Sequence, residues 1–110
     1  TEIYTLIKTF TDNAIRYTPK GGRIDLGFNE TAEYLNIWVE DDGPGIPPSE
    51  RQRVIDPFYR ILGTEQQGTG LGLSIANTIV KRHQGRLKLA DSQRFDSGLL
   101  IIAELDKKTL

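Results

Sequence analysis

Three polar side chains share one face of the helix that the first residues of the chain predict. Thr9, Asn13 and Arg16 are spaced i, i+4 and i+7, so a helix places them one above another. The amide oxygen of Asn13 is a hard ligand of the kind that Mg²⁺ prefers. The guanidinium of Arg16, one turn further on, suits a phosphate. Taken alone, three polar residues are more typical of a solvated helix face.

A second segment whose residues could bind a ligand is the acidic, glycine-rich run Asp41–Pro47. Its two glycines flank a proline, which lets the backbone turn sharply and approach a ligand closely. The Asp41 carboxylate, at the end of an expected strand, can accept a hydrogen bond from an exocyclic amine. A plain turn is the simpler interpretation of this segment, because Asp, Gly and Pro dominate turns.

A third segment, Gly68–Ser74, opens the second long helix that the sequence predicts. Glycines at a helix N-terminus expose backbone N–H groups and the positive end of the helix dipole, which together favour a phosphate. The segment lacks the Gly-Lys-Ser/Thr ending of a P-loop, and Leu73 interrupts the dinucleotide fingerprint. A flexible linker is the alternative, but linkers rarely carry Leu at alternate positions, so phosphate binding is favoured.

The remaining candidates are more typical of structural roles. His83 is the single histidine and falls near the end of the second long helix, where a surface or half-buried position is expected. Tyr17, Trp38, Phe58 and Tyr59 are likewise more typical of core or surface aromatics than of ligand stackers.

Hydrophobic periodicity predicts the elements that would position these segments. Apolar residues at helical spacing predict a first helix that ends before Pro19 and a second over 71–84, with Gly85 as its C′ residue. A short helix over 48–55 and strands over 24–28, 35–40, 86–90 and 99–105 complete the set. This order favours an α+β domain, a two-layer α/β sandwich in which three helices cover one face of a mixed, mostly antiparallel sheet.

Composition excludes several classes of function. The chain has 110 residues, 14 Lys and Arg against 15 Asp and Glu, and no Cys. A net charge of −1 supplies no basic field, so no nucleic-acid partner is expected. Without Cys there is no disulfide, thiolate metal site or Cys nucleophile. A chain that begins at Thr1 rather than Met is expected to be a fragment of a longer protein, and we expect this fragment to be monomeric.

Considered together, four segments resemble the conserved boxes of sensor histidine kinases, in the family's order and with similar gaps. The resemblance covers essentially the whole chain, and the combination is far more specific than any single box. The matching segments are Asp12–Pro19 (N box), Asp41–Ile46 (G1 box), Pro57–Arg60 (F box) and Gly68–Leu73 (G2 box).

The resemblance implies a Bergerat ATP-binding fold over residues 1–110 and a role for each matching residue. Asn13 would ligate Mg²⁺, Arg16 and Arg60 would contact phosphates, and Tyr17 would border the nucleotide. Asp41 would accept from the adenine amine. The residues implied to shape the adenine pocket are Gly43, Gly45 and Ile46; those implied to hold the phosphates are Gly68, Thr69, Gly70, Leu71, Gly72 and Leu73. Residues 61–67 would form a lid.

The function implied is transfer of the γ-phosphoryl group of Mg·ATP to a His on a separate dimerisation domain of the same kinase, with a response regulator downstream. The whole protein would be a homodimer anchored in a bacterial inner membrane, with this domain in the cytoplasm. The implied catalytic residues are Asn13, Arg16 and Arg60. The dimerisation, sensor and transmembrane regions are absent from the chain.

Two other functions compete with this interpretation. A related ATPase of the gyrase and chaperone kind needs a carboxylate base one helical turn before the Asn, but Thr9 occupies that position. A nucleotide-sensing module without kinase chemistry is the second alternative, and the intact boxes count against it. The chain also lacks the family's strand before the first helix.

Overall fold

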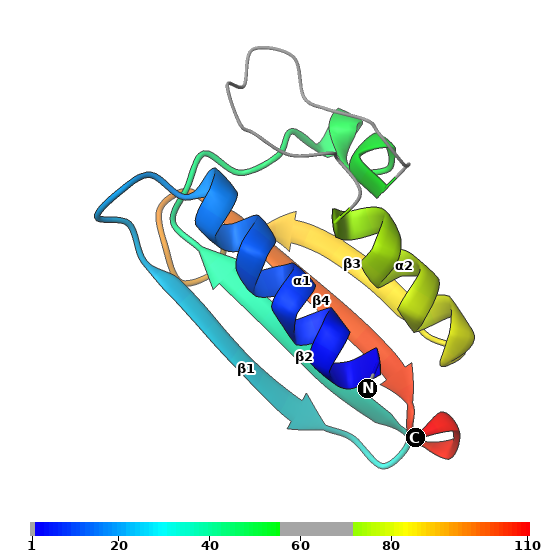
Figure 1. Ribbon diagram of the computed structural model, residues 1–110. Helices are drawn as coiled ribbons and strands as arrows, with labels where there is room; N and C mark the ends of the chain where they lie inside the picture. The colour runs from blue at the N-terminus through cyan, green and yellow to red at the C-terminus, as the bar shows by residue number, and fades with distance from the viewer. Residues whose placement is uncertain (1, 56–71) are drawn as a thin grey trace.

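The computed structural model describes residues 2–55 and 72–110, which form two layers. Two α-helices lie side by side on one face of a four-stranded sheet of order β1-β2-β4-β3 (Figure 1). The elements are α1 (Glu2–Tyr17), β1 (Ile24–Glu30), β2 (Tyr34–Asp41), α2 (Gly72–Arg82), β3 (Arg86–Asp91) and β4 (Leu99–Asp106), with 3₁₀ turns at Pro48–Glu50, Arg53–Ile55 and Lys107–Thr109.

Helix α1 forms where the apolar stripe was expected. Leu6, Phe10 and Ala14 recur at helical spacing and are at most 1% exposed, so this stripe faces the sheet. The helix ends before Pro19, which has no N–H to donate and cannot continue the helix. The C-terminal end of α1 is thereby placed above the end of β2.

The sheet is antiparallel at every pairing, and its alternation separates two faces. Leu26 pairs with Val39, and Val39 in turn pairs with Ile101, so these residues share the face that the helices cover. Val39 and Ile101 are each 1% exposed. Glu40 lies one residue further along β2 and therefore points to the opposite, outer face.

Helix α2 ends at Arg82 in a Schellman motif, and its C′ residue lies one position earlier than the expected Gly85. Gln84 occupies the left-handed C′ position with φ 53°, and the N–H of Gly85 donates to the Val80 carbonyl at 2.8 Å. Gly85 is required for a different reason: a Cβ there would lie 1.6 Å from the carbonyl oxygen of Glu104. The glycine therefore allows the chain to cross close to β4.

Two expectations about the architecture are wrong for the described residues. The sheet is wholly antiparallel rather than mixed, and two α-helices rather than three cover it. The predicted short helix over 48–55 is instead two 3₁₀ turns. A segment this short does not recover the cost of nucleating an α-helix.

Candidate functional site

A pocket of about 160 Å³ lies between the C-terminal half of α1 and the loop that follows β2. Five of its residues were predicted from the sequence to bind a ligand: Asn13, Tyr17, Asp41, Gly45 and Ile46. Its remaining lining residues are Pro44, Pro47 and Leu99. The pocket thus brings together the polar face of the first helix and the acidic, glycine-rich loop, which are about thirty residues apart in the sequence.

Asp41 is the charged group in the lining of this pocket, and it is only 5% exposed. Its Oδ1 accepts hydrogen bonds from the backbone N–H of Gly43 at 2.9 Å and of Leu99 at 3.4 Å. Within the described residues no hydrogen bond reaches Oδ2. One carboxylate oxygen is therefore fixed by the backbone, and the other is free to accept from a ligand.

Burial raises the pKa of Asp41 above its usual value. The hydrogen bonds from Gly43 and Leu99 act in the opposite direction, and the neighbouring carboxylates of Asp42 and Glu40 raise this pKa further. A ligand that donates a hydrogen bond to the carboxylate would relieve part of the cost of burying it.

The glycines let the loop after β2 pack directly against the end of α1. A Cβ on Gly43 would lie 2.9 Å from the Tyr17 carbonyl oxygen and 3.1 Å from Asp41 Oδ1. Gly45 adopts φ +75°, a conformation that L side chains rarely adopt. The sharp turn predicted from the two glycines is present, and it forms one wall of the pocket.

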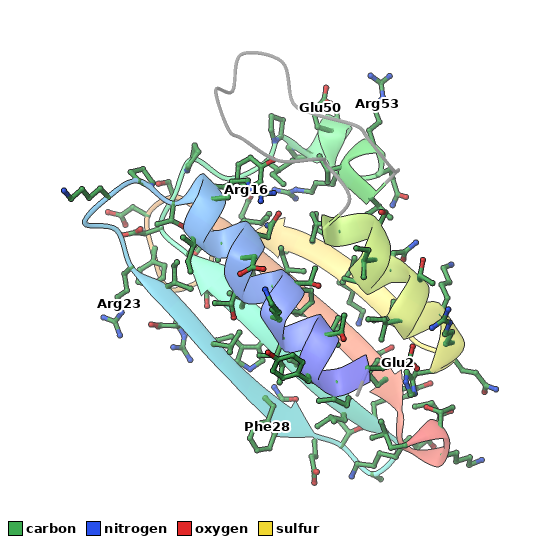
Figure 2. All side chains as sticks on the ribbon, viewed as in Figure 1. Glu2, Arg16, Arg23, Phe28, Glu50 and Arg53 are labelled. Carbon is green, nitrogen blue, oxygen red and sulfur yellow. The ribbon has the colours of Figure 1, made fainter. Side chains whose placement is uncertain are left out.

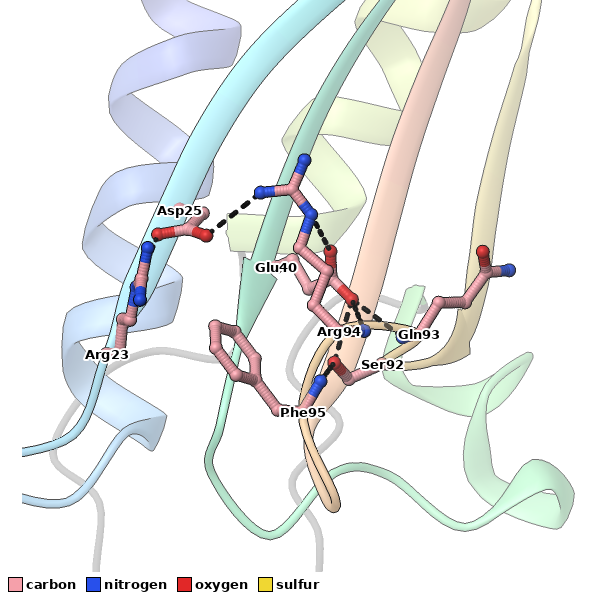
Figure 3. Close-up of polar contacts among 7 residues, drawn as sticks. All are labelled: Arg23, Asp25, Glu40, Ser92, Gln93, Arg94 and Phe95. Carbon is pink, nitrogen blue, oxygen red and sulfur yellow. Dashed lines mark hydrogen bonds and ion pairs between the residues drawn. The ribbon is translucent and has the colours of Figure 1, made fainter.

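Glu40 forms a second buried carboxylate site on the outer face of the sheet, which the sequence did not predict. It is 3% exposed, and its Oε2 accepts from Ser92 Oγ at 2.7 Å and from the backbone N–H groups of Gln93 at 2.6 Å and Arg94 at 3.0 Å (Figure 3). Burial alone would raise the pKa of Glu40, but these hydrogen bonds and the Arg94 charge together hold it below its usual value.

The loop of residues 92–98, which is hydrogen-bonded to Glu40, packs against Gly43 and Asp41 beside the pocket. Ser97 Oγ donates to the Gly43 carbonyl at 3.0 Å. A Cβ on Gly98 would lie 1.8 Å from the Asp41 carbonyl oxygen, so only glycine fits there without a shift. In the sequence this loop appeared only as a polar connection, because its contacts with Gly43 and Asp41 span more than fifty residues.

The other predicted site residues are placed as follows. Arg16 lies at the C-terminal end of α1, the end of the molecule where Glu50 and Arg53 also lie (Figure 2). Gly72 opens α2, and Leu73 is 5% exposed and belongs to the hydrophobic core. The remaining predicted residues, together with the F box and the lid over 61–67, lie outside the described residues: Arg60, Gly68, Thr69, Gly70 and Leu71.

His83 lies at the opposite end of α2 from Gly72, away from the pocket. Its side chain is 12% exposed, with Nδ1 2.6 Å from Thr109 Oγ1 and Nε2 3.3 Å from Glu2 Oε1. The half-buried structural position expected for this histidine is therefore confirmed.

A family model described as "Histidine kinase-, DNA gyrase B-, and HSP90-like ATPase" matches residues 1–109. This chain belongs to that family. The sensor histidine kinase CpxA of Escherichia coli strain K12 is 36% identical over 106 residues, which cover 94% of this chain and 23% of CpxA. The resemblance to the catalytic domain of sensor histidine kinases is thus confirmed.

Solved structures show the same likeness. The mycobacterial sensor histidine kinase MprB aligns with a TM-score of 0.81 and 30% identity, covering 96% of this chain and 70% of that one. A nucleotide-free catalytic domain of the histidine kinase ThkA aligns with a TM-score of 0.81 and 28% identity, covering 96% of this chain and 67% of that one.

Two facts describe how this chain relates in length and hydropathy to a whole sensor kinase. The chain spans about a quarter of the length of CpxA. Across residues 2–55 and 72–110, no helix has the length and apolar character needed to cross a membrane.

The pKa of Glu40 predicts a pH-dependent contribution to stability. Because the folded pKa lies below the ordinary 4.5, ionised Glu40 stabilises the fold above about pH 4.5, and this contribution is lost as the pH falls through the folded pKa. Glu40→Gln should lower the free energy of unfolding at pH 7 by about 1–3 kcal/mol. In a series of urea denaturations at different pH, the difference in free energy of unfolding between wild type and Glu40→Gln should become smaller below about pH 4.

Glu104→Gln is the matched control, because Glu104 lies on the same outer face and, among the described residues, forms an ion pair only with the part-exposed Lys88, at 3.2 Å. Its effect should stay within about 1 kcal/mol at either pH. A Glu40→Gln gap that is constant or widens from pH 7 to pH 3 would contradict the account. The raised pKa of Asp41 has the opposite sign, and Glu40→Gln changes it only slightly, because the Glu40 charge has the smallest of the effects that shift this pKa.

Proposed function

We propose that this chain binds Mg·ATP and acts as the phosphoryl-donating domain of a sensor histidine kinase. The acceptor is a His on a separate dimerisation domain of the same protein, and a response regulator receives the phosphoryl group next. The whole protein is a homodimer in a bacterial inner membrane, with this domain on the cytoplasmic side. The observation that supports the proposal most is the buried Asp41 carboxylate, which offers one free oxygen to a small, mainly apolar pocket.

The pocket suits the adenine base. Ile46, Pro47 and Leu99 supply apolar contact for a flat ring. Asp41 Oδ2 accepts from the exocyclic amino group, while the backbone holds Oδ1 in place. A base that carries a carbonyl oxygen at that position would set two acceptors against each other in a buried site.

The polar face of α1 suits the phosphates. Asn13 lines the pocket and can offer its amide oxygen to Mg²⁺. Arg16, in the last turn of α1, can offer a cation to phosphate oxygens. No group of three or more His, Cys, Asp or Glu in residues 2–55 and 72–110 could hold a metal ion, so Mg²⁺ would depend on the nucleotide for its other ligands.

When bound, ATP supplies the γ-phosphoryl group, and this chain's residues bind and orient it. Arg60 and the glycines of 68–72 are proposed to contact the phosphates on the strength of the motif resemblance. The family also includes hydrolytic ATPases. Thr9, one turn before Asn13, has a hydroxyl rather than a carboxylate and cannot act as a general base for water at neutral pH, which favours transfer to a His over hydrolysis.

The first prediction concerns base selectivity. ADP should bind more tightly than inosine diphosphate, whose base carries a carbonyl oxygen in place of the amino group. A lost charge-assisted hydrogen bond costs about 1.5–3 kcal/mol, or roughly 10- to 150-fold in affinity. Calorimetric titration measures both dissociation constants.

Asp41→Asn should lose most of the preference for ADP. The control Asp42→Asn should keep it, because Asp42 accepts from the Arg23 N–H and does not line the pocket. Equal wild-type affinities for the two nucleotides would refute the assignment.

The second prediction concerns the metal. Asn13→Ala removes the proposed ligand oxygen, so Mg²⁺ should no longer strengthen the binding of a non-hydrolysable ATP analogue. Asn13→Asp keeps an oxygen and should retain part of the Mg²⁺ effect. Asp12→Ala is the control, because Asp12 is half-exposed and pairs with Lys8. An unchanged Mg²⁺ response in Asn13→Ala would show that the metal does not depend on this side chain.

The third prediction concerns the acceptor. His83 follows Gly72 by eleven residues, which is about 16 Å along a helix, and transfer needs reacting atoms about 3–3.5 Å apart. Radiolabelled ATP should therefore leave this chain unlabelled and should label the dimerisation domain of the same protein when it is added. His83→Gln should transfer the label as wild type does. Acid-labile label on this chain alone, abolished by His83→Gln, would contradict the proposal.

A further inference from the structure

We propose that Glu40 is a positioning residue for base recognition: it holds the loop of residues 92–98 in the shape that fixes the Asp41 carboxylate. This inference rests on the proposed function, because it concerns the same base pocket. Glu40 itself does not line that pocket and points to the outer face of the sheet. Its effect on a nucleotide must therefore pass through the loop.

The loop depends on Glu40 for its attachment to the sheet. Gln93, Arg94, Asp96 and Ser97 are exposed, and the part-buried Phe95 supplies the apolar burial of this segment. The three hydrogen bonds to Glu40 Oε2 gather its first three residues at one buried point. Hydrogen bonds to a buried carboxylate are stronger than neutral ones, and each donor would lose its partner if the carboxylate were removed.

Three further contacts stiffen this attachment. Ser92 Oγ, which donates to Glu40, also accepts from the backbone N–H of Phe95 at 3.0 Å. Arg94 places its guanidinium 4.9 Å from the Trp38 ring centre and donates to Asp25 Oδ2 at 3.0 Å, a bond visible in Figure 3. The two Arg94 contacts are exposed and weaker, so the carboxylate is the principal anchor.

The other end of the same loop determines where Asp41 lies. Ser92 N–H donates to the Gly98 carbonyl at 3.0 Å, which closes the loop between the Glu40 anchor and the pocket wall. Gly98 packs against the Asp41 backbone, and the next residue, Leu99, donates its N–H to Asp41 Oδ1. If the anchored end shifts, the Leu99 donor moves, and Asp41 Oδ1 keeps only the Gly43 donor, so the direction of the free oxygen is less firmly fixed.

The test compares ADP with inosine diphosphate in calorimetric titrations of wild type, Glu40→Ala and Glu40→Gln. Glu40→Ala should reduce the ratio of ADP to inosine diphosphate affinity by about 3- to 10-fold, as expected for a hydrogen bond that is weakened rather than lost. Affinity for inosine diphosphate should change by less than about twofold. Glu40→Gln keeps an acceptor oxygen and should recover part of the ratio, whereas a purely structural defect would lower both affinities together.

Further variants make the result decisive. Glu104→Ala, on the same outer face, should keep the wild-type ratio. In an Asp41→Asn background, Glu40→Ala should leave the ratio unchanged, because the group that it positions has been removed. If Glu40→Ala does not fold, the ratio of ADP to inosine diphosphate affinity is compared with wild type in Glu40→Gln and Ser92→Ala instead. A wild-type ratio in the folded Glu40 variants would overturn this inference alone, whereas equal wild-type affinities for both nucleotides would overturn the proposed function.

Discussion

Two adjacent carboxylates are buried at the end of β2, on opposite faces of the sheet, and each must find hydrogen-bond donors. A buried charge without partners costs several kcal/mol. The folded state is therefore stable only if donors reach Glu40 on the outer face and Asp41 on the inner one. One segment supplies donors to both. Residues 92–94 donate to Glu40, and Leu99, at the start of β4, donates to Asp41. Gly98 is needed between them because the chain passes so close to the Asp41 carbonyl.

The difference between the two carboxylates separates positioning from contact with the ligand. Glu40 receives enough donors from the protein to hold its pKa below the usual value, so it fixes the loop of residues 92–98 and does not itself contact the ligand. Among the described residues Asp41 receives backbone donors on one oxygen only, its pKa is raised by burial, and it lines a pocket together with Asn13 and Tyr17. A carboxylate oxygen that lacks a protein donor beside a pocket is suited to a ligand that brings one.

Local patterns predicted much of this structure. The apolar stripe of α1, the four strands and the sharp turn at Gly43 and Gly45 each depend on residues close together in the sequence, and all are present. What the sequence could not predict depends on contacts between distant residues. Glu40 looked like an ordinary strand residue, and the 92–98 loop like a solvated connection, because their mutual contacts span more than fifty residues. The position of Leu99 in the pocket lining could not be predicted for the same reason. The short helix over 48–55 failed because its pattern is too brief to distinguish an α-helix from 3₁₀ turns.

The central claim is that Asp41 offers its free oxygen to the amino group of adenine. The most direct measurement is a crystal structure of this chain with ADP and Mg²⁺. The account predicts the purine ring between Ile46 and Leu99, with its exocyclic nitrogen at hydrogen-bond distance, about 2.7–3.2 Å, from Asp41 Oδ2. ADP bound with its base outside this pocket, or with its amino group directed away from Asp41, would contradict it.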